Sequence, residues 1–106
     1  MVVKCEDIIF EDLGDGVSRK VLAHDGGMML VEVTFKKGSV GAQHQHPHEQ
    51  VSYVLSGQFE YTVDGKSYIL KKGDSYYVPP EAMHGVTALE DSLILDVFTP
   101  QREDFL

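Results

Sequence analysis

The sequence predicts an all-β domain, and three observations support that prediction. Short apolar runs are separated by turn residues, such as the two-residue hairpin signal Asp64-Gly65 and the break at Pro79-Pro80. No stretch keeps a helical period for more than one turn. Eight or more short strands arranged in this way are typical of a β-sandwich or barrel. We therefore expect a small barrel in which alternate residues of each strand face the lumen.

The predicted strands follow one another along a single domain that spans residues 1–106. This length is enough to bury a hydrophobic core without disulfide bonds or structural metals. The chain shows no repeat, linker or low-complexity tract. The expected strands are residues 17–23, 28–35, 51–57, 59–63, 66–70, 75–78, 83–87 and 92–98.

The composition excludes several classes of partner. Acidic residues outnumber basic ones 17 to 9, for a formal charge of −8, and no cluster of Lys or Arg forms a face. We therefore expect no nucleic-acid partner and no membrane partner. The single cysteine, Cys5, cannot form an intrachain disulfide. The N-terminus lacks the apolar core of a signal peptide, and no apolar run approaches the roughly 20 residues of a membrane span, so we expect a cytoplasmic protein.

Residues 44–50 form the densest run of metal-ligating side chains in the chain. Residues two apart in an extended strand point to the same face, so His44 and His46 are expected to form one wall of a divalent metal site. The best candidates for the third and fourth ligands are Gln50 and His84. Imidazole suits borderline divalent metals, and a carbonyl-type oxygen can complete the ligand shell.

His48 is the ambiguous residue of this run. It shares the parity of the two histidines before it, but the turn expected after Pro47 changes its direction. We place His48 at the rim of the site, and a ligand role for it stays open. Glu49 is expected to be exposed to solvent, and His24 is expected to lie on the surface in the turn at residues 24–27.

The C-terminal segment is the second place where polar residues interrupt an apolar pattern. The strand predicted over residues 92–98 is apolar on both faces except for Asp96, and a carboxylate there is costly to bury unless it is paired or functional. Asp96 and Phe98 share one parity, so both are expected to line the lumen. Arg102 follows the break at Pro100 and is expected to swing over the pocket mouth. The alternative is a structural ion pair between Asp96 and Arg102.

A first glycine-bounded motif resembles that of the cupin family. It runs from Gly38 through five residues to His44, one residue to His46, three residues to Gln50 and six residues to Gly57. Most cupins have Glu where this chain has Gln50. The spacing between His46 and Gln50 is also tight, because relatives tolerate one more residue there.

A second motif resembles the cupin pattern in part. It runs from Gly73 through five residues to Pro79 and then to His84, with Glu81 where most cupins have Gly. The resemblance covers roughly residues 28–100. It implies a small cupin fold, which is a double-stranded β-helix or jelly-roll barrel. It does not identify an activity, because cupins host many chemistries.

Within the cupins, the chain resembles the pectin-degradation (KdgF) group. The similarity lies in the runs Tyr-Val-Leu-Ser-Gly and Val-Asp-Gly and in the C-terminal Asp-Val-Phe-x-Pro-x-Arg-Glu-Asp-Phe-Leu. Members of this group open the ring of 4,5-unsaturated uronates, the end products of pectate and alginate lyases, to give linear 5-keto-4-deoxyuronate. By this resemblance the metal ligands fall on His44, His46, Gln50 and His84, and the active-site residues fall on Asp96, Phe98 and Arg102.

The residue types favour the same chemistry. Three neutral imidazoles and a neutral amide leave the full +2 charge on a bound metal, whereas Glu in place of Gln50 would cancel part of it. This favours a Lewis-acid role over oxygen activation. Asp96 is then the expected proton shuttle, Arg102 the expected grip on a substrate carboxylate, and Phe98 the residue that shapes the pocket. The alternatives are a metal-dependent cupin dioxygenase and a non-catalytic sugar-binding cupin.

The sequence leaves the metal, the source of the sugar and the assembly open. Nickel, zinc, manganese and iron all accept three His ligands and one Gln ligand. The substrate is expected to be a small acidic sugar, derived from pectin or from alginate. A homodimer is expected, because small cupins commonly pair through exposed strands at the barrel edge.

Overall fold

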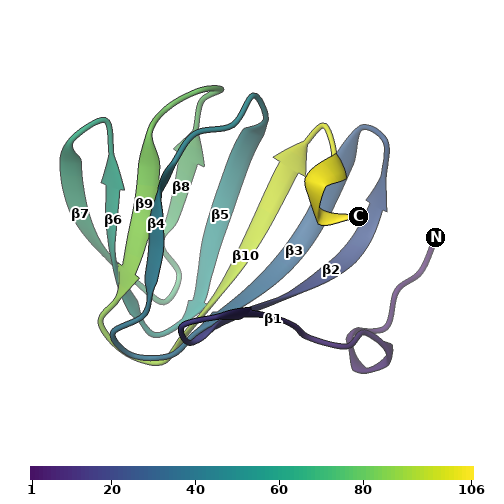
Figure 1. The fold of residues 1–106 in the computed structure, drawn as a ribbon, viewed down its shortest axis with the longest axis horizontal. Coiled ribbons are helices and arrows are strands. Elements are labelled where there is room, and N and C mark those ends of the chain that lie inside the picture. Colours follow the sequence, from purple (N-terminus) through teal and green to yellow (C-terminus); the bar gives the residue numbers. More distant parts are fainter.

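The computed structural model describes residues 1–106 as two antiparallel β-sheets packed into a jelly roll (Figure 1). Two 3₁₀-helices lie outside the strands, η1 (Cys5–Asp7) near the N-terminus and η2 (Glu103–Phe105) at the C-terminus. The strands are β1 (Glu11–Gly14), β2 (Val17–Asp25), β3 (Met28–Phe35), β4 (Val40–His44), β5 (Glu49–Ser56), β6 (Gln58–Val63), β7 (Lys66–Lys71), β8 (Ser75–Val78), β9 (His84–Ala88) and β10 (Ser92–Thr99).

One sheet has six strands and the other has four. The larger sheet has the order β1-β2-β3-β10-β5-β8, and the smaller has the order β4-β9-β6-β7. All-β architecture and the eight predicted strands are confirmed, and β1 and β4 are additional. The two sheets are not joined into one closed barrel, and they form the predicted jelly roll. β1 is short and fully exposed at a sheet edge, which explains why no apolar alternation marked it.

The core lies between the sheets and is built by alternation. On β3 every second residue is buried, from Met29 to Phe35, and these side chains pack on those of the other strands. Phe35 meets Phe59 of β6 edge to face, with ring centroids 5.2 Å apart, and so ties the two sheets together. Phe59 pairs with one end of β9, and His84 lies at the other end. The apolar packing at one end of the smaller sheet therefore leaves its opposite end for polar side chains.

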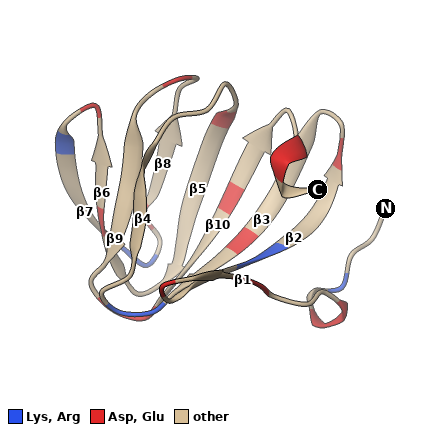
Figure 2. Cartoon of the chain, viewed as in Figure 1, with Lys and Arg blue, Asp and Glu red and all other residues tan.

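Charged residues are distributed unevenly between the surface and the interior. In the view of Figure 2, Lys and Arg are scattered over several strands and turns. One acidic band lies in the middle of β10, and Asp96 is the acidic residue of that strand (Figure 2). No helix in the structure is long and apolar enough to span a membrane.

His24 lies elsewhere than expected. It belongs to the end of β2 rather than to a turn, and it is half-buried. Its Nδ1 lies 2.8 Å from the Gln101 side-chain oxygen, so it ties β2 to the C-terminal segment. The prediction that His24 lies in a turn is therefore wrong, because its strand extends two residues beyond the predicted end.

Candidate metal centre and active-site pocket

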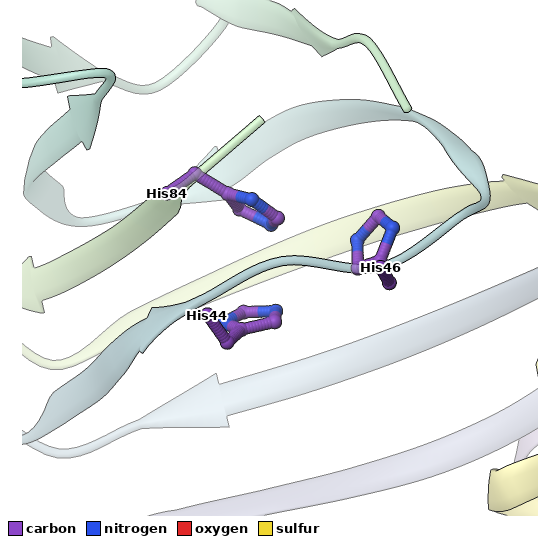
Figure 3. Close-up of side chains that lie close together, drawn as sticks. All are labelled: His44, His46 and His84. Atoms are coloured by element: carbon purple, nitrogen blue, oxygen red, sulfur yellow. The ribbon is translucent and has the colours of Figure 1, made fainter. Parts of the chain in front are cut away.

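The side chains of His44, His46 and His84 converge at one end of the smaller sheet (Figure 3). Each offers one ring nitrogen, and these three atoms all lie within 4.8 Å of one another. His44 ends β4 and His84 begins β9, and the two are direct cross-strand partners. Their ring centroids are 4.3 Å apart. His46 and His84 are buried, whereas His44 is exposed.

His46 reaches this cluster from a loop. The expectation that it shares a strand face with His44 is wrong, because β4 ends at His44 and β5 begins only at Glu49. The backbone carbonyl of His46 accepts a hydrogen bond from the amide of Glu81 at 2.8 Å, which anchors the loop. Its ring centroid lies 4.9 Å from that of His84. The loop path, rather than strand alternation, therefore brings the third imidazole into place.

Backbone carbonyls hold all three imidazoles in one tautomer. The Nδ1 atoms of His44 and His84 each lie 2.9 Å from the carbonyl oxygen two residues earlier, and that of His46 lies 3.0 Å from the carbonyl oxygen two residues later. A carbonyl oxygen can only accept, so each Nδ1 carries the proton and each Nε2 of the neutral ring keeps its lone pair. Histidines that ligate metals are oriented by this kind of bond.

Gln50 adds an oxygen to the three nitrogens. It lies on β5 and is buried. Its amide nitrogen donates to Ser52 Oγ at 2.9 Å, and it lies 3.4 Å from Asp96 Oδ1. The amide oxygen therefore points the other way and lies 2.9 Å from His46 Nε2. Both of these atoms carry lone pairs when His46 is neutral, so they need a shared cation or proton to approach this closely.

The buried His84 nitrogen supports a metal at this place. Its Nε2 is buried and has no hydrogen-bond partner, which is costly unless a ligand is bound there. Burial lowers the pKa of His84 to about 4, although its bond to a backbone carbonyl opposes this, and the nearby His44, His46 and Arg102 lower it further. His84 is therefore neutral at physiological pH. Three neutral imidazoles and one amide oxygen fit a divalent transition metal.

A pocket of about 290 Å³ opens beside the histidines. The inward parity predicted for β10 is correct, because Asp96 and Phe98 both face this space. The polar and aromatic side chains that line it are Arg19, Phe35, His44, Gln50, Tyr76, His84, Asp96, Phe98, Arg102 and Phe105. All predicted ligands and active-site residues therefore border this pocket except His46, whose ring contacts that of Phe98 at a centroid distance of 5.7 Å.

Asp96 is held by polar partners in the interior of the pocket. Ser52 donates its hydroxyl proton to Asp96 Oδ1 at 2.5 Å. Burial raises the pKa of Asp96 to about 6, although the bonds from Ser52 and Gln50 and the charge of Arg102 pull it down. A carboxyl whose pKa lies this close to neutrality can both take up and release a proton under working conditions.

Arg102 is buried and pairs with Asp104 rather than with Asp96. Its Nε and Nη2 atoms bond the two carboxylate oxygens of Asp104 at 3.0 and 2.8 Å. The alternative of an Asp96–Arg102 ion pair is therefore wrong. The guanidinium also lies over the rings of Phe105 and Phe98, at 4.3 and 5.0 Å from their centroids. The bond from Arg102 lowers the pKa of Asp104.

His48 lies outside the converging group. Its carbonyl orients His46, and its ring lies 5.5 Å from the His46 ring and 6.3 Å from the Phe98 ring. His48 is absent from the pocket lining, so its position at the rim stays a prediction. Glu49 is exposed as expected and accepts a hydrogen bond from Tyr77 at 2.8 Å.

Several residues of the site escaped sequence reasoning. They are Arg19, Ser52, Asp104 and Phe105. Ser52 had a usable signal, because it is polar on the inward parity of its strand. Arg19 had the same signal, since it alternates with two valines. Asp104 and Phe105 lie in the C-terminal run that resembles the KdgF group, but no periodic pattern marked them as site residues, because the short helix η2 that positions them has none.

The chain is similar to known proteins over nearly its whole length. A family model described as a cupin domain matches residues 31–98. The pectin degradation protein KdgF of Dickeya dadantii (strain 3937) is 44% identical over 99 residues, which cover 92% of this chain and 90% of that protein. The solved structure of KdgF from Halomonas sp. has a TM-score of 0.96 and 40% identity, covering 100% of this chain and 98% of that one.

A second solved structure gives the same result. The RmlC-like cupin from Shewanella frigidimarina NCIMB 400 has a TM-score of 0.96 and 40% identity, covering 99% of this chain and 95% of that one. The predicted jelly-roll cupin fold is therefore confirmed. The motif resemblance is also confirmed, and the chain belongs to the cupin family and, within it, to the KdgF family.

Proposed function

We propose that this protein is a metal-dependent enzyme that opens the ring of 4,5-unsaturated uronate monosaccharides to give linear 5-keto-4-deoxyuronate. The observation that carries the proposal is the half-buried Asp96 carboxyl, which lines the pocket beside the three converging histidines. Membership of a family whose Dickeya member is named a pectin degradation protein supports an acidic sugar as substrate. The proposal covers the unsaturated monosaccharides released from pectin and those released from alginate.

The reaction moves one proton and needs no other reactant. The substrate has an enol ether, C4=C5–O5, conjugated to a carboxylate, and a hemiacetal hydroxyl at C1. Loss of the C1 hydroxyl proton forms the C1 aldehyde and breaks the C1–O5 bond, which leaves an enolate at C4, C5 and O5. Addition of a proton at C4 then gives the C5 ketone. The product is an isomer of the substrate.

Asp96 is the proposed proton shuttle between O1 and C4. Its raised pKa suits both steps, because a group near neutrality accepts and releases protons readily. Phe98 faces the same pocket from the same strand and provides an apolar surface for the sugar face. Since Asp96 and Phe98 are two residues apart on β10, one strand positions both the acid and the apolar surface.

Arg102 is the proposed grip for the substrate carboxylate. Asp104 accepts one N–H from Nε and one from Nη2, so both N–H groups of Nη1 and the second N–H of Nη2 remain as donors for a ligand. The guanidinium lies over two aromatic rings, which restricts its movement and shields it from water. A carboxylate bound there would place the conjugated double bond in the pocket that Asp96 also lines.

We propose His44, His46, Gln50 and His84 as the residues that hold the metal. A divalent ion supplies positive charge that stabilises the negative oxygen left when C1–O5 breaks. Nickel, zinc, manganese and iron all suit this donor set. Elemental analysis of the purified protein identifies the bound metal, with a His84→Ala variant as the control that should lose it.

The test uses unsaturated galacturonate monomer and the ultraviolet absorbance of its conjugated double bond. Metal-loaded protein is expected to accelerate the loss of absorbance well above the spontaneous rate, and a chelator is expected to remove the acceleration. The alginate-derived monomer, run in parallel, reports the preferred source. No acceleration with either monomer would contradict the proposal.

The two alternatives predict different results in the same experiment. A cupin dioxygenase would need oxygen, so its activity would stop under anaerobic conditions, whereas ring opening is expected to continue. A sugar-binding cupin would bind the monomer without changing its absorbance. In that case Asp96→Asn would have no effect on either signal.

We also propose that the protein is a homodimer, and its cytoplasmic location stays a prediction. Val51, Tyr53 and Tyr77 leave about half of their surface exposed, at 47%, 45% and 52%, next to the edge strand β8. Exposed apolar groups beside a free strand edge favour pairing of two copies. Sedimentation of the wild type is expected to give a dimer, and Val51→Lys is expected to shift it toward the monomer. A monomeric wild type would contradict this proposal.

A further inference from the structure

We propose that Ser52 is a positioning residue that fixes the orientation of the Gln50 amide, so that its oxygen rather than its nitrogen faces the three histidines. The inference rests on the metal site of the proposed function and extends it to a residue outside the histidine cluster that does not itself line the pocket but bonds two residues that do. The oxygen and the NH₂ group of the Gln50 amide have nearly the same shape, so a hydrogen-bond partner decides which of them faces the histidines.

Ser52 occupies a central position in the interior. It is completely buried, and its strand neighbours on the same face are Gln50 and Val54. Across the sheet it lies directly opposite Asp96 on β10 and Tyr76 on β8. The serine side chain is too small to add much apolar packing, so its hydroxyl group is what it contributes at this position.

The hydrogen bonds of Ser52 have a fixed direction. Its hydroxyl has one proton, and the Asp96 carboxylate at 2.5 Å accepts it. The lone pairs of the same oxygen then face the Gln50 side chain at 2.9 Å. Only a donor suits that place, and the amide nitrogen of Gln50 is the donor. Asp96 Oδ1, which lies 3.4 Å from the same nitrogen, reinforces this choice because it too accepts.

The reversed amide would be unfavourable on both sides. Its oxygen would face the Ser52 lone pairs and the Asp96 carboxylate, and its NH₂ group would point at His46. An NH₂ group cannot ligate a metal, so the site would lose its one oxygen donor. A Gln ligand needs a partner that fixes the orientation of its amide, whereas a Glu would present an oxygen in either orientation. In this chain, which has Gln50 where most cupins have Glu, the ligand therefore depends on Ser52 for its orientation.

The test measures metal affinity by competition with a chelator, without substrate. Ser52→Ala is expected to weaken metal binding by about 10-fold or more, the range seen when partners that orient ligands are removed. The visible spectrum of the cobalt-loaded protein is expected to change in Ser52→Ala, because the oxygen donor is no longer held. Ser92→Ala is the matched control, since Ser92 is also a buried serine with hydrogen bonds but lies at the other end of β10.

A double-mutant comparison separates orientation from packing. In a Gln50→Glu background both ends of the side chain are oxygens, so Ser52→Ala is expected to weaken metal binding by less than about threefold. An equal loss in both backgrounds would overturn the inference and assign Ser52 a packing role. Unchanged affinity and spectrum in the single variant would overturn it as well. Neither result depends on turnover, so failure of the uronate assay leaves this test valid.

Discussion

Two walls of the pocket are built in different ways. The histidine wall, formed by His44, His46 and His84, is held by backbone carbonyls no more than two residues away in the chain. The acid wall, formed by Asp96 and Arg102, is held by side chains: Ser52 bonds the first and Asp104 bonds the second. Gln50 joins the walls, since its oxygen faces His46 and its nitrogen faces Ser52 and Asp96.

Because they are held in different ways, the two walls should respond differently to substitution. Local backbone bonds are set once the strands and loop are formed, so the histidine wall should tolerate changes on the other side of the pocket. The acid wall depends on side-chain bonds in an interior of low dielectric, where removing one partner leaves another unsatisfied. Substitutions of Asp96 or Arg102 should change proton transfer and substrate binding more readily than metal content, whereas Ser52 also reaches a proposed metal ligand through Gln50.

The largest effect is expected from removing a member of the histidine wall. His84→Ala should lose the metal and lower kcat/KM by about 10³-fold or more, because the lost charge stabilisation is worth several kcal/mol. Metal content and turnover check this together. His24→Ala is the matched control, since His24 is a half-buried histidine outside the site. Metal retained by His84→Ala at the wild-type level would contradict the assignment of ligands.

The next largest effect is expected in the acid wall. Asp96→Asn should lower kcat by roughly 10²- to 10⁴-fold, the usual contribution of a positioned acid–base group. Metal content and substrate binding should stay near the wild-type values, because the amide keeps the shape of the carboxyl. Steady-state kinetics and a direct binding measurement separate these effects. Full activity in Asp96→Asn would show that another group moves the proton.

The pH dependence of stability in the metal-free protein should distinguish the two walls by sign. The folded-state pKa of Asp96, about 6, lies above its ordinary value of 3.8, so the folded state binds more protons and stability falls as the pH rises through this range. The folded-state pKa of His84, about 4, lies below its ordinary value of 6.5, so this group makes stability rise over a similar range. The two contributions oppose each other in the wild type.

Single substitutions should separate the contributions of Asp96 and His84 to the pH dependence of stability. Between pH 4 and 6.5, the free energy of unfolding of metal-free Asp96→Asn should rise relative to wild type by up to about 3 kcal/mol, because a shift of one pKa unit is worth about 1.4 kcal/mol. That of His84→Gln should fall by a similar amount. Chemical denaturation across this range is the measurement. Parallel profiles for all three proteins would contradict both pKa shifts.

The smallest effect is expected at the edge of the acid wall. Asp104 has a side chain that is 58% exposed, so its bond to Arg102 is worth at most about 1 kcal/mol. Asp104→Asn should raise KM by about two- to fivefold, because Arg102 is held less firmly, with kcat nearly unchanged. Glu103→Gln is the matched control for loss of a neighbouring negative charge. A lower KM in Asp104→Asn would show instead that Asp104 competes with the substrate.

The difference between the histidine wall and the acid wall also explains which parts of the site could be predicted from the sequence. The resemblance to the two cupin motifs identified His44, Gln50 and His84 as neighbours, and the structure brings the three together. Strand alternation correctly placed Asp96 and Phe98 in the lumen. The position of His46 was predicted for the wrong reason, since a loop rather than a strand carries it.

The partners of the acid wall could not be predicted in the same way. Asp104 reaches Arg102 through a three-residue helix without a periodic pattern, so the sequence suggested Asp96 as its partner instead. Ser52 bonds Asp96 across two strands that are far apart in the chain. Which polar residues meet across a sheet depends on strand register, and register was beyond the patterns in one sequence.

The central claim is that this pocket, loaded with metal, delivers the proton to C4 of the unsaturated sugar. The most direct measurement is the reaction in deuterated water, followed early by proton magnetic resonance. The account predicts one deuterium at C4 of the linear product in a single configuration, because Asp96 reaches the sugar from one side. An equal mixture of the two configurations, matching the spontaneous reaction, would contradict it.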